Sequence, residues 1–216
     1  PSWLIHVMDT AFLESETGRR PGTYADDPDG AYLDFQHKAG TCFIDQYLAH
    51  NPLSMGQHGY ESDTERSATT GLEHIVLDGM AINSPEDVAD HIEQFEIPRL
   101  GEAIDSFNPD DDDAVASLIE HEIRTQERFG PDILKVPYGG GFQAFPCFRY
   151  GQYGYAHYFM AYALYPDVIE QDFALQAEYA LKHNRRAARA YQEGGLPRVL
   201  RLDFDMTDSR GPLASP

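Results

Sequence analysis

Three short segments of this sequence place charged or aromatic side chains where strands are expected to end. The first ends at Asp45, the second is the glycine-rich turn 138–143, and the third is the segment 202–212. In parallel α/β proteins the functional side chains gather at the carboxyl ends of the strands. We therefore expect groups from these three segments to meet in one site.

The candidate side chains fall into two classes. The candidate catalytic groups are the carboxylates of Asp45 and Asp205. The candidate substrate-binding groups, which are arginines, tyrosines and one further aspartate, are Arg149, Tyr150, Tyr153, Asp203 and Arg210. A guanidinium group can hold a carboxylate through two parallel hydrogen bonds, and a tyrosine can hydrogen-bond a carboxylate or stack on a ring. Two alternatives stay open, an ion pair with a neighbouring aspartate for the last arginine and core packing for the tyrosines.

Hydrophobic periodicity and turn residues predict the elements that must position these groups. Strands are expected at 41–45, 73–77, 132–138 and 198–204. Helices are expected at 31–38, 84–95, 108–129 and 166–193. This order of helices and strands is typical of parallel βαβ units. It does not separate a closed barrel from an open sheet.

Capping residues mark the starts of two of the predicted helices. Ser84 can cap the first of them, Pro85 suits its first position, and Asp87 can complete a reciprocal capping pair. The four aspartates 110–113 open the next helix, where carboxylates meet the positive end of the helix dipole. Their position directly before an apolar stripe favours a solvated cap over a metal site.

A formal net charge of −20 dominates the composition. Phosphate binding needs basic stripes that this sequence lacks, which argues against a nucleic-acid partner. Because no apolar run approaches the roughly 18 residues that cross a bilayer, we expect no membrane association, no leader peptide and a cytoplasmic location. Cys42 and Cys147 form no CxxC pair, which is typical of a reducing compartment and of thiols used for packing.

Taken together, the three segments resemble the uroporphyrinogen decarboxylase superfamily. The segment 43–48 with Gly56 downstream is similar to the strand-end aspartate segment of these enzymes, and the turn 140–142 with the tyrosines that follow is similar to their glycine and aromatic loop. The segment 202–205 resembles a later Phe-Asp strand end of the family. The ending 203–216 resembles the Arg-Gly-Pro segment of its decarboxylase-like and methyltransferase-like branches.

The resemblance implies a (β/α)₈ TIM barrel and a single domain over residues 1–216. Barrels of this kind typically need about 250 residues. We therefore expect this chain to be a fragment that holds the N-terminal and central part of the barrel and lacks its C-terminal βα units.

The resemblance also implies an enzyme that removes CO₂ from a carboxylate side chain of a tetrapyrrole without a cofactor. Loss of CO₂ from an acetate on a pyrrole requires protonation of the ring, and a fixed carboxylate in a dry pocket stabilises the resulting positive charge. Asp45 is the candidate for this role, and a cap of the following segment is its alternative. Two positions depart from the family. The segment 17–24 matches its arginine-rich Gln-Ala-Gly-Arg-Tyr segment only loosely, and Met206 stands where the family has a serine.

Two other functions stay open within the same resemblance. Related enzymes transfer a methyl group between a corrinoid protein and a thiol, using zinc held by His and Cys ligands from the part of the family's chain that we expect to be missing here. The nine histidines show no HxxxH or HxC spacing, so no metal ligand is assigned. The third alternative is a non-catalytic module that binds a tetrapyrrole or a corrinoid. The expected partners are accordingly a tetrapyrrole, a corrinoid or a corrinoid protein, and a homodimer is left open.

Overall fold

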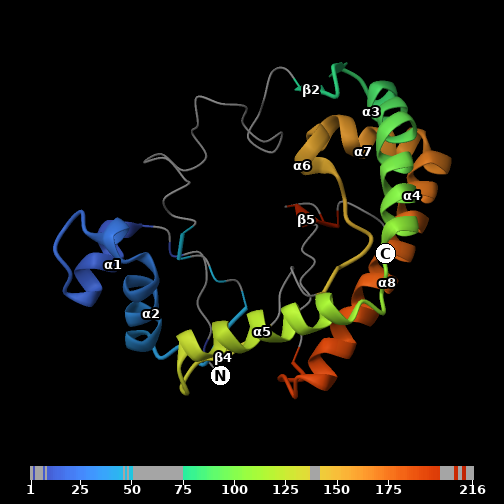
Figure 1. Ribbon diagram of the computed structural model, residues 1–216. Helices are drawn as coiled ribbons and strands as arrows, with labels where there is room; N and C mark the ends of the chain where they lie inside the picture. Colours follow the sequence, from blue (N-terminus) through green and yellow to red (C-terminus); the bar gives the residue numbers. More distant parts are fainter. Residues whose placement is uncertain are drawn as a thin grey trace.

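The computed structural model describes residues 9–45, 75–136 and 142–199, the single positions 2, 7, 47, 49 and 50, and the backbone of 207–208 and 211–212. Helices make up most of this described chain (Figure 1). The α-helices are α1 (Thr10–Thr17), α2 (Pro28–Lys38), α3 (Pro85–His91), α4 (Ile97–Ser106), α5 (Asp112–Phe129), α6 (Tyr150–Tyr153), α7 (Tyr155–Leu164) and α8 (Pro166–Glu193). Two further helical turns are the 3₁₀ turn η1 (Tyr24–Asp26) and the π-helical turn η3 (Ile92–Glu96).

The described strands are short and pair only in twos. They are β1 (Phe43–Ile44), β2 (Ile75–Leu77), β3 (Met80–Ile82), β4 (Leu134–Lys135), β5 (Thr207–Asp208) and β6 (Gly211–Pro212). β1 pairs with β4 in parallel, whereas β2 with β3 and β5 with β6 form antiparallel pairs. One pair of the described strands therefore has the parallel arrangement that the sequence pattern predicts.

The predicted (β/α)₈ TIM barrel is wrong for the described chain, which has no arrangement of eight βα units around a closed sheet. One physical reason lies at the end of β2. Asp78 and Gly79 have φ of 51° and 80°, and two successive residues with positive φ make the tight hairpin turn that suits antiparallel strands. The chain thus returns directly as β3 and does not enter the crossover helix that a parallel neighbour would need.

The predicted helices are confirmed, several of them with their caps. Ser84 accepts a hydrogen bond from the Asp87 backbone N–H at 3.1 Å, and the Asp87 carboxylate accepts one from the Asn83 backbone N–H at 2.9 Å. Asp111 caps α5 through the Ala114 N–H at 3.0 Å. The aspartate run is therefore a helix start, as the sequence predicts.

A π-helical turn separates α3 from α4 in an otherwise continuous helix. Pro98 stands in the first turn of α4, where it has no N–H to donate and its ring would clash with the carbonyl four residues earlier. The wider turn η3 accommodates this clash without ending the helix. It also turns Glu96 toward α6 and α8, where that carboxylate forms an ion pair with Arg149.

The described core has two main apolar clusters, and α5 runs between them (Figure 1). One cluster packs the β2–β3 hairpin against α3, α7 and the first turns of α8. The other packs α2 against β1 and the end of α5. Because α5 also packs along α8, it links the parallel pair β1–β4 to the larger helical part.

Candidate functional site

Asp45 lies at the carboxyl end of the parallel strand pair. It follows Ile44 directly, and its residue is 6% exposed. Ile44 pairs in register with Lys135, and the Val136 N–H donates to the Ile44 carbonyl at 2.9 Å. A buried carboxylate therefore stands at the edge where β1 and β4 both end, which is the position that the sequence pattern predicts for a functional group.

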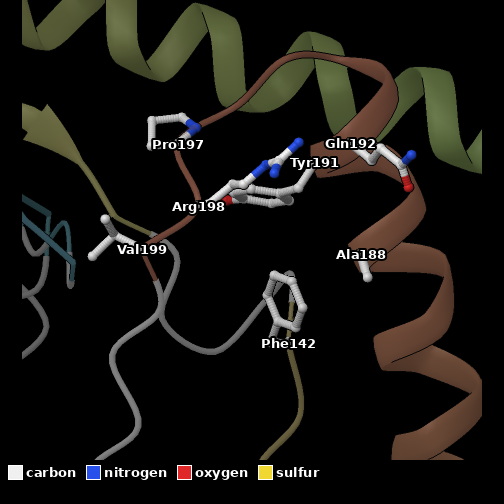
Figure 2. A pocket seen from close by; sticks show the side chains of 7 residues that line it. All are labelled: Phe142, Ala188, Tyr191, Gln192, Pro197, Arg198 and Val199. Carbon is white, nitrogen blue, oxygen red and sulfur yellow. The ribbon is translucent and has the colours of Figure 1, made fainter.

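The second predicted segment contributes to a cavity whose other lining residues come from the end of α8 and the chain that follows it. The cavity has a volume of about 400 Å³, and Phe142 from the glycine-rich turn lines it together with Arg198 and Val199 from the start of the predicted last strand (Figure 2). The second segment follows β4, the partner of β1. The first segment is thus paired with the strand that leads to the second, and the cavity joins Phe142 to the first two residues of the predicted strand 198–204. The side chains of 202–212 lie outside the described residues.

Polar contacts hold the wall of this cavity in place. The Tyr191 hydroxyl donates to the Glu122 carboxylate, which also forms an ion pair with Lys135 of β4. Burial, with a further contribution from the bond to Glu122, raises the pKa of Tyr191. Lys135 is bound a second time, because its backbone N–H donates to Gln126 Oε1 at 2.8 Å. α5, α8 and β4 are therefore joined at one buried point.

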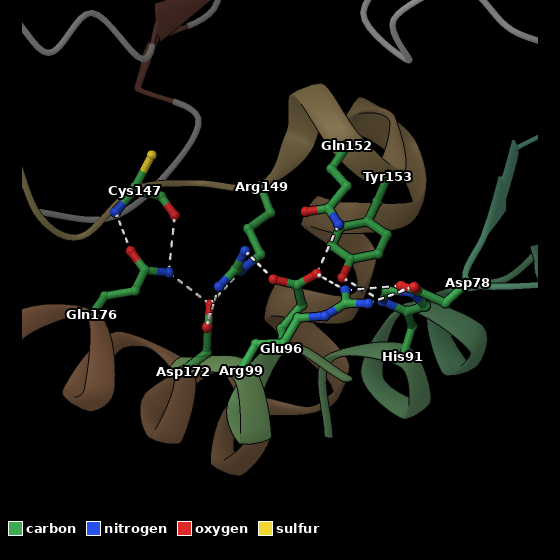
Figure 3. Close-up of polar contacts among 10 residues, drawn as sticks. All are labelled: Asp78, His91, Glu96, Arg99, Cys147, Arg149, Gln152, Tyr153, Asp172 and Gln176. Carbon is green, nitrogen blue, oxygen red and sulfur yellow. Dashed lines mark hydrogen bonds and ion pairs between the residues drawn. The ribbon is translucent and has the colours of Figure 1, made fainter. Parts of the chain in front are cut away.

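Arg149, a predicted substrate-binding residue, lies between two carboxylates (Figure 3). Its Nε and Nη2 donate to the two oxygens of Asp172 at 2.9 and 2.8 Å, and its Nη1 donates to Glu96 Oε2 at 2.8 Å. Burial opposes the charge of Arg149, but the hydrogen bonds to Asp172 and the negative charges of Asp172 and Glu96 together outweigh it and raise the pKa of the guanidinium. A substrate carboxylate at Arg149 would have to compete with both of these partners, so its binding role stays a prediction.

Tyr153 is fully buried, and its hydroxyl lies 2.9 Å from His91 Nδ1. The other ring nitrogen of His91 lies 3.0 Å from Asp78 Oδ2. An Nε2–H that donates to Asp78, with Nδ1 accepting from the tyrosine hydroxyl, satisfies all three groups. Arg99 binds the same Asp78 carboxylate through both terminal nitrogens and holds the pKa of Asp78 below its ordinary value.

Tyr150, the neighbouring candidate, is only half-buried. Its ring stacks on that of Tyr155 with centroids 4.5 Å apart, and burial raises its pKa. The short helix α6 thus brings Arg149, Tyr150 and Tyr153 together. They pack with α3 and α7, whereas Asp45 adjoins the α2 cluster, so the described chain does not place these residues in one site with Asp45. The remaining candidates have side chains outside the described residues: Asp203, Asp205 and Arg210.

A second cavity of about 380 Å³ adjoins Arg149. Its polar lining includes Gln152, Gln176 and the exposed Cys147. Gln176 binds the backbone of Cys147 twice, accepting from its N–H at 2.7 Å and donating to its carbonyl at 3.2 Å. The amide thereby fixes the loop before α6, and no described histidine is bonded to the thiol as a base for nucleophilic catalysis.

Sequence reasoning missed the buried partners of these networks, Asp172 and Glu122 above all. A signal for Asp172 is visible in α8, because it shares a face with the buried Ile169 and Gln176, one turn away on either side. A carboxylate on the apolar face of a helix needs a buried cation. Arg149 is that cation, but nothing in the spacing identifies it.

The described residues contain neither a cluster of metal ligands nor a membrane-spanning helix. No group of three or more His, Cys, Asp or Glu side chains there could hold a metal ion. No helix in the same ranges is long and apolar enough to span a membrane.

No model of a known protein family matches the chain, and no curated protein or solved structure is significantly similar to it.

Proposed function

We propose that this chain acts as a decarboxylase-like enzyme on a carboxylate side chain of a tetrapyrrole, with Asp45 at its charged centre. The observation that carries the proposal is the buried Asp45 at the carboxyl end of the parallel pair β1–β4, in a segment that resembles the uroporphyrinogen decarboxylase superfamily. The second such segment follows β4 in the chain, and its Phe142 lines a cavity with Arg198 and Val199 of the strand expected to precede the third segment. This arrangement needs a shared strand edge and does not need a closed barrel.

The reaction requires a fixed negative charge close to the substrate ring. Protonation of a pyrrole carbon makes the ring cationic. The bond from the acetate methylene to its carboxylate then breaks, CO₂ leaves, and the electron pair of that bond neutralises the ring. Protonation of the methylene and loss of the ring proton complete the change from acetate to methyl. Asp45, held at 6% exposure, would stabilise the cationic ring, because a charge acts more strongly where water is excluded.

The predicted residues of the third segment keep their places in the proposal. Asp205 would share the charged centre with Asp45, and Asp203 and Arg210 would bind substrate from the third segment. Arg149 lies apart from Asp45 and is paired with Glu96 and Asp172, so its role in substrate binding stays a prediction. No cofactor is required for this chemistry.

The test is CO₂ release from a porphyrinogen by the wild type and by Asp45→Asn. Asparagine keeps the shape of the side chain and removes its charge, so we expect turnover to fall by about 100-fold or more while porphyrinogen binding is retained. Asp132→Asn is the matched control, since Asp132 is exposed and precedes β4, at the opposite end of the parallel pair from Asp45. Unchanged turnover in Asp45→Asn would contradict the proposal. Binding without turnover in the wild type would favour a non-catalytic module.

A further inference from the structure

The cavity at the end of α8 has the form of a binding site for a small aromatic molecule. Its volume of about 400 Å³ lies in the range of small-molecule pockets. Two of its walls are rings, Phe142 and Tyr191, whose centroids lie 5.4 Å apart at an interplanar angle of 61° (Figure 2). Ala188 and Pro197 add apolar surface. A flat ring can pack against walls of this kind edge to face or in an offset stack.

One cation lines the same cavity, and no described residue pairs with it. Arg198 is exposed at the cavity and takes part in no salt bridge of the described chain. Most other described arginines do form ion pairs: Arg19, Arg99, Arg124, Arg128, Arg149, Arg185 and Arg189. In a chain with a net charge of −20, a guanidinium without a described carboxylate partner is available to an external anion.

We propose that this cavity binds a planar aromatic carboxylate, with its ring packed against the contacting pair Phe142 and Tyr191 and its carboxylate on Arg198. The guanidinium fork matches a carboxylate through two hydrogen bonds. The ring of Tyr191 is held in advance by its bond to Glu122, which lowers the ordering cost of binding. The net negative charge of the protein is screened beyond about 8 Å at physiological salt. The attraction of the ligand carboxylate to Arg198 therefore outweighs its repulsion by distant carboxylates. This inference goes beyond the proposed function, because binding here requires neither Asp45 nor any reaction.

The probe is 2-naphthoate, with 2-naphthylmethanol as an uncharged molecule of similar shape, and binding is measured by calorimetric titration. We expect the wild type to bind the acid more tightly than the alcohol. Arg198→Gln should weaken binding of the acid by about tenfold and leave binding of the alcohol unchanged. Arg185→Gln is the matched control, because Arg185 is an exposed arginine of the same region that does not line the cavity. It should bind both molecules as the wild type does.

A second variant tests the cavity without changing charge. Ala188 is exposed and lines the cavity, so Ala188→Trp should fill the space without disturbing the core and should abolish binding of both probes. Equal binding of the acid by wild type and Arg198→Gln, or unchanged binding by Ala188→Trp, would overturn the inference. Asp45→Asn should bind 2-naphthoate normally, which separates this result from failure of the decarboxylase proposal.

Discussion

Individual side chains of this protein are held by buried ionic groups as well as by apolar packing. Arg149 lies between Asp172, which is fully buried, and Glu96, which the π-helical turn directs toward it. His91 is bound on both ring nitrogens, by Tyr153 and Asp78. Such ionic groups stabilise the fold only when every charge has its partner, because a buried charge that loses its partner keeps its full desolvation cost. A mutation that removes one member of such a group should therefore destabilise the protein mainly by leaving the other member buried without its partner.

Asp172→Asn tests the ionic cluster around Arg149. The change leaves the guanidinium with Glu96 as its one ionic partner in the described chain, and we expect the free energy of unfolding in urea to fall by about 3 kcal/mol. Glu120→Gln is the control, since Glu120 and Arg124 form an exposed pair one helical turn apart, where the loss should stay below about 0.5 kcal/mol. Equal stability of the two variants would show that the buried cluster adds nothing.

Asp78 should contribute to the acid limb of the stability curve. Its pKa is lowered in the folded state by the hydrogen bonds from Arg99. The stabilisation is therefore complete above the ordinary aspartate pKa of about 3.9 and is lost as the pH falls through the lower folded value. Asp78→Asn should flatten this part of the curve, measured as the free energy of unfolding against pH.

Asparagine also tolerates the positive φ of this position, so the substitution leaves the hairpin turn unstrained. Asp132→Asn serves as the control and should leave the acid limb as in the wild type. A loss of stability in acid that runs in parallel for Asp78→Asn and the wild type would exclude this role of Asp78.

Among the elements, the helices follow from local sequence and the sheet pairs do not. α8 has the predicted bounds because Pro166 suits the start of a helix, a long apolar face follows, and Gly194 comes at its end. β1 and β4 are two residues long and lie about 90 positions apart, so little in either strand specifies the partner. The hairpin turn at Asp78 and Gly79 is visible in the sequence, since an Asp-Gly pair is typical of tight hairpins.

Substituting alanine at two glycines should change the free energy of unfolding in opposite directions. A Cβ at Gly194 would lie 2.9 Å from Ile119 Cγ2, where α5 packs on the end of α8, so Gly194→Ala should lower the free energy of unfolding by about 1–3 kcal/mol. Gly101 lies within α4 with open space around it, so Gly101→Ala should raise the same quantity by about 0.5–1 kcal/mol. Thermal or urea unfolding measures both. A stabilising Gly194→Ala would contradict the close packing of the two helices.

At the scale of the whole molecule, the sequence led to two separate expectations. One was that the three segments lie together, and the other was that the strands close into a barrel. Asp45 and Phe142 come from the first two segments and Arg198 from the strand expected to precede the third, and strand pairing or a shared cavity connects their parts of the chain. The closed barrel is wrong, because motif order constrains which strand ends lie together and does not specify how many strands pair. The buried network of Arg149 could not be predicted either, since its partners lie 23 and 53 positions away in sequence.

The most direct test of the proposed activity is CO₂ release from a porphyrinogen by the wild-type protein, measured with and without a metal chelator and alongside its zinc content. If Asp45 supplies the charge that the reaction needs, as proposed, CO₂ release continues unchanged when metal is removed, and this is the result we predict. Stoichiometric zinc with no CO₂ release would contradict the decarboxylase proposal and favour methyl transfer to or from a corrinoid.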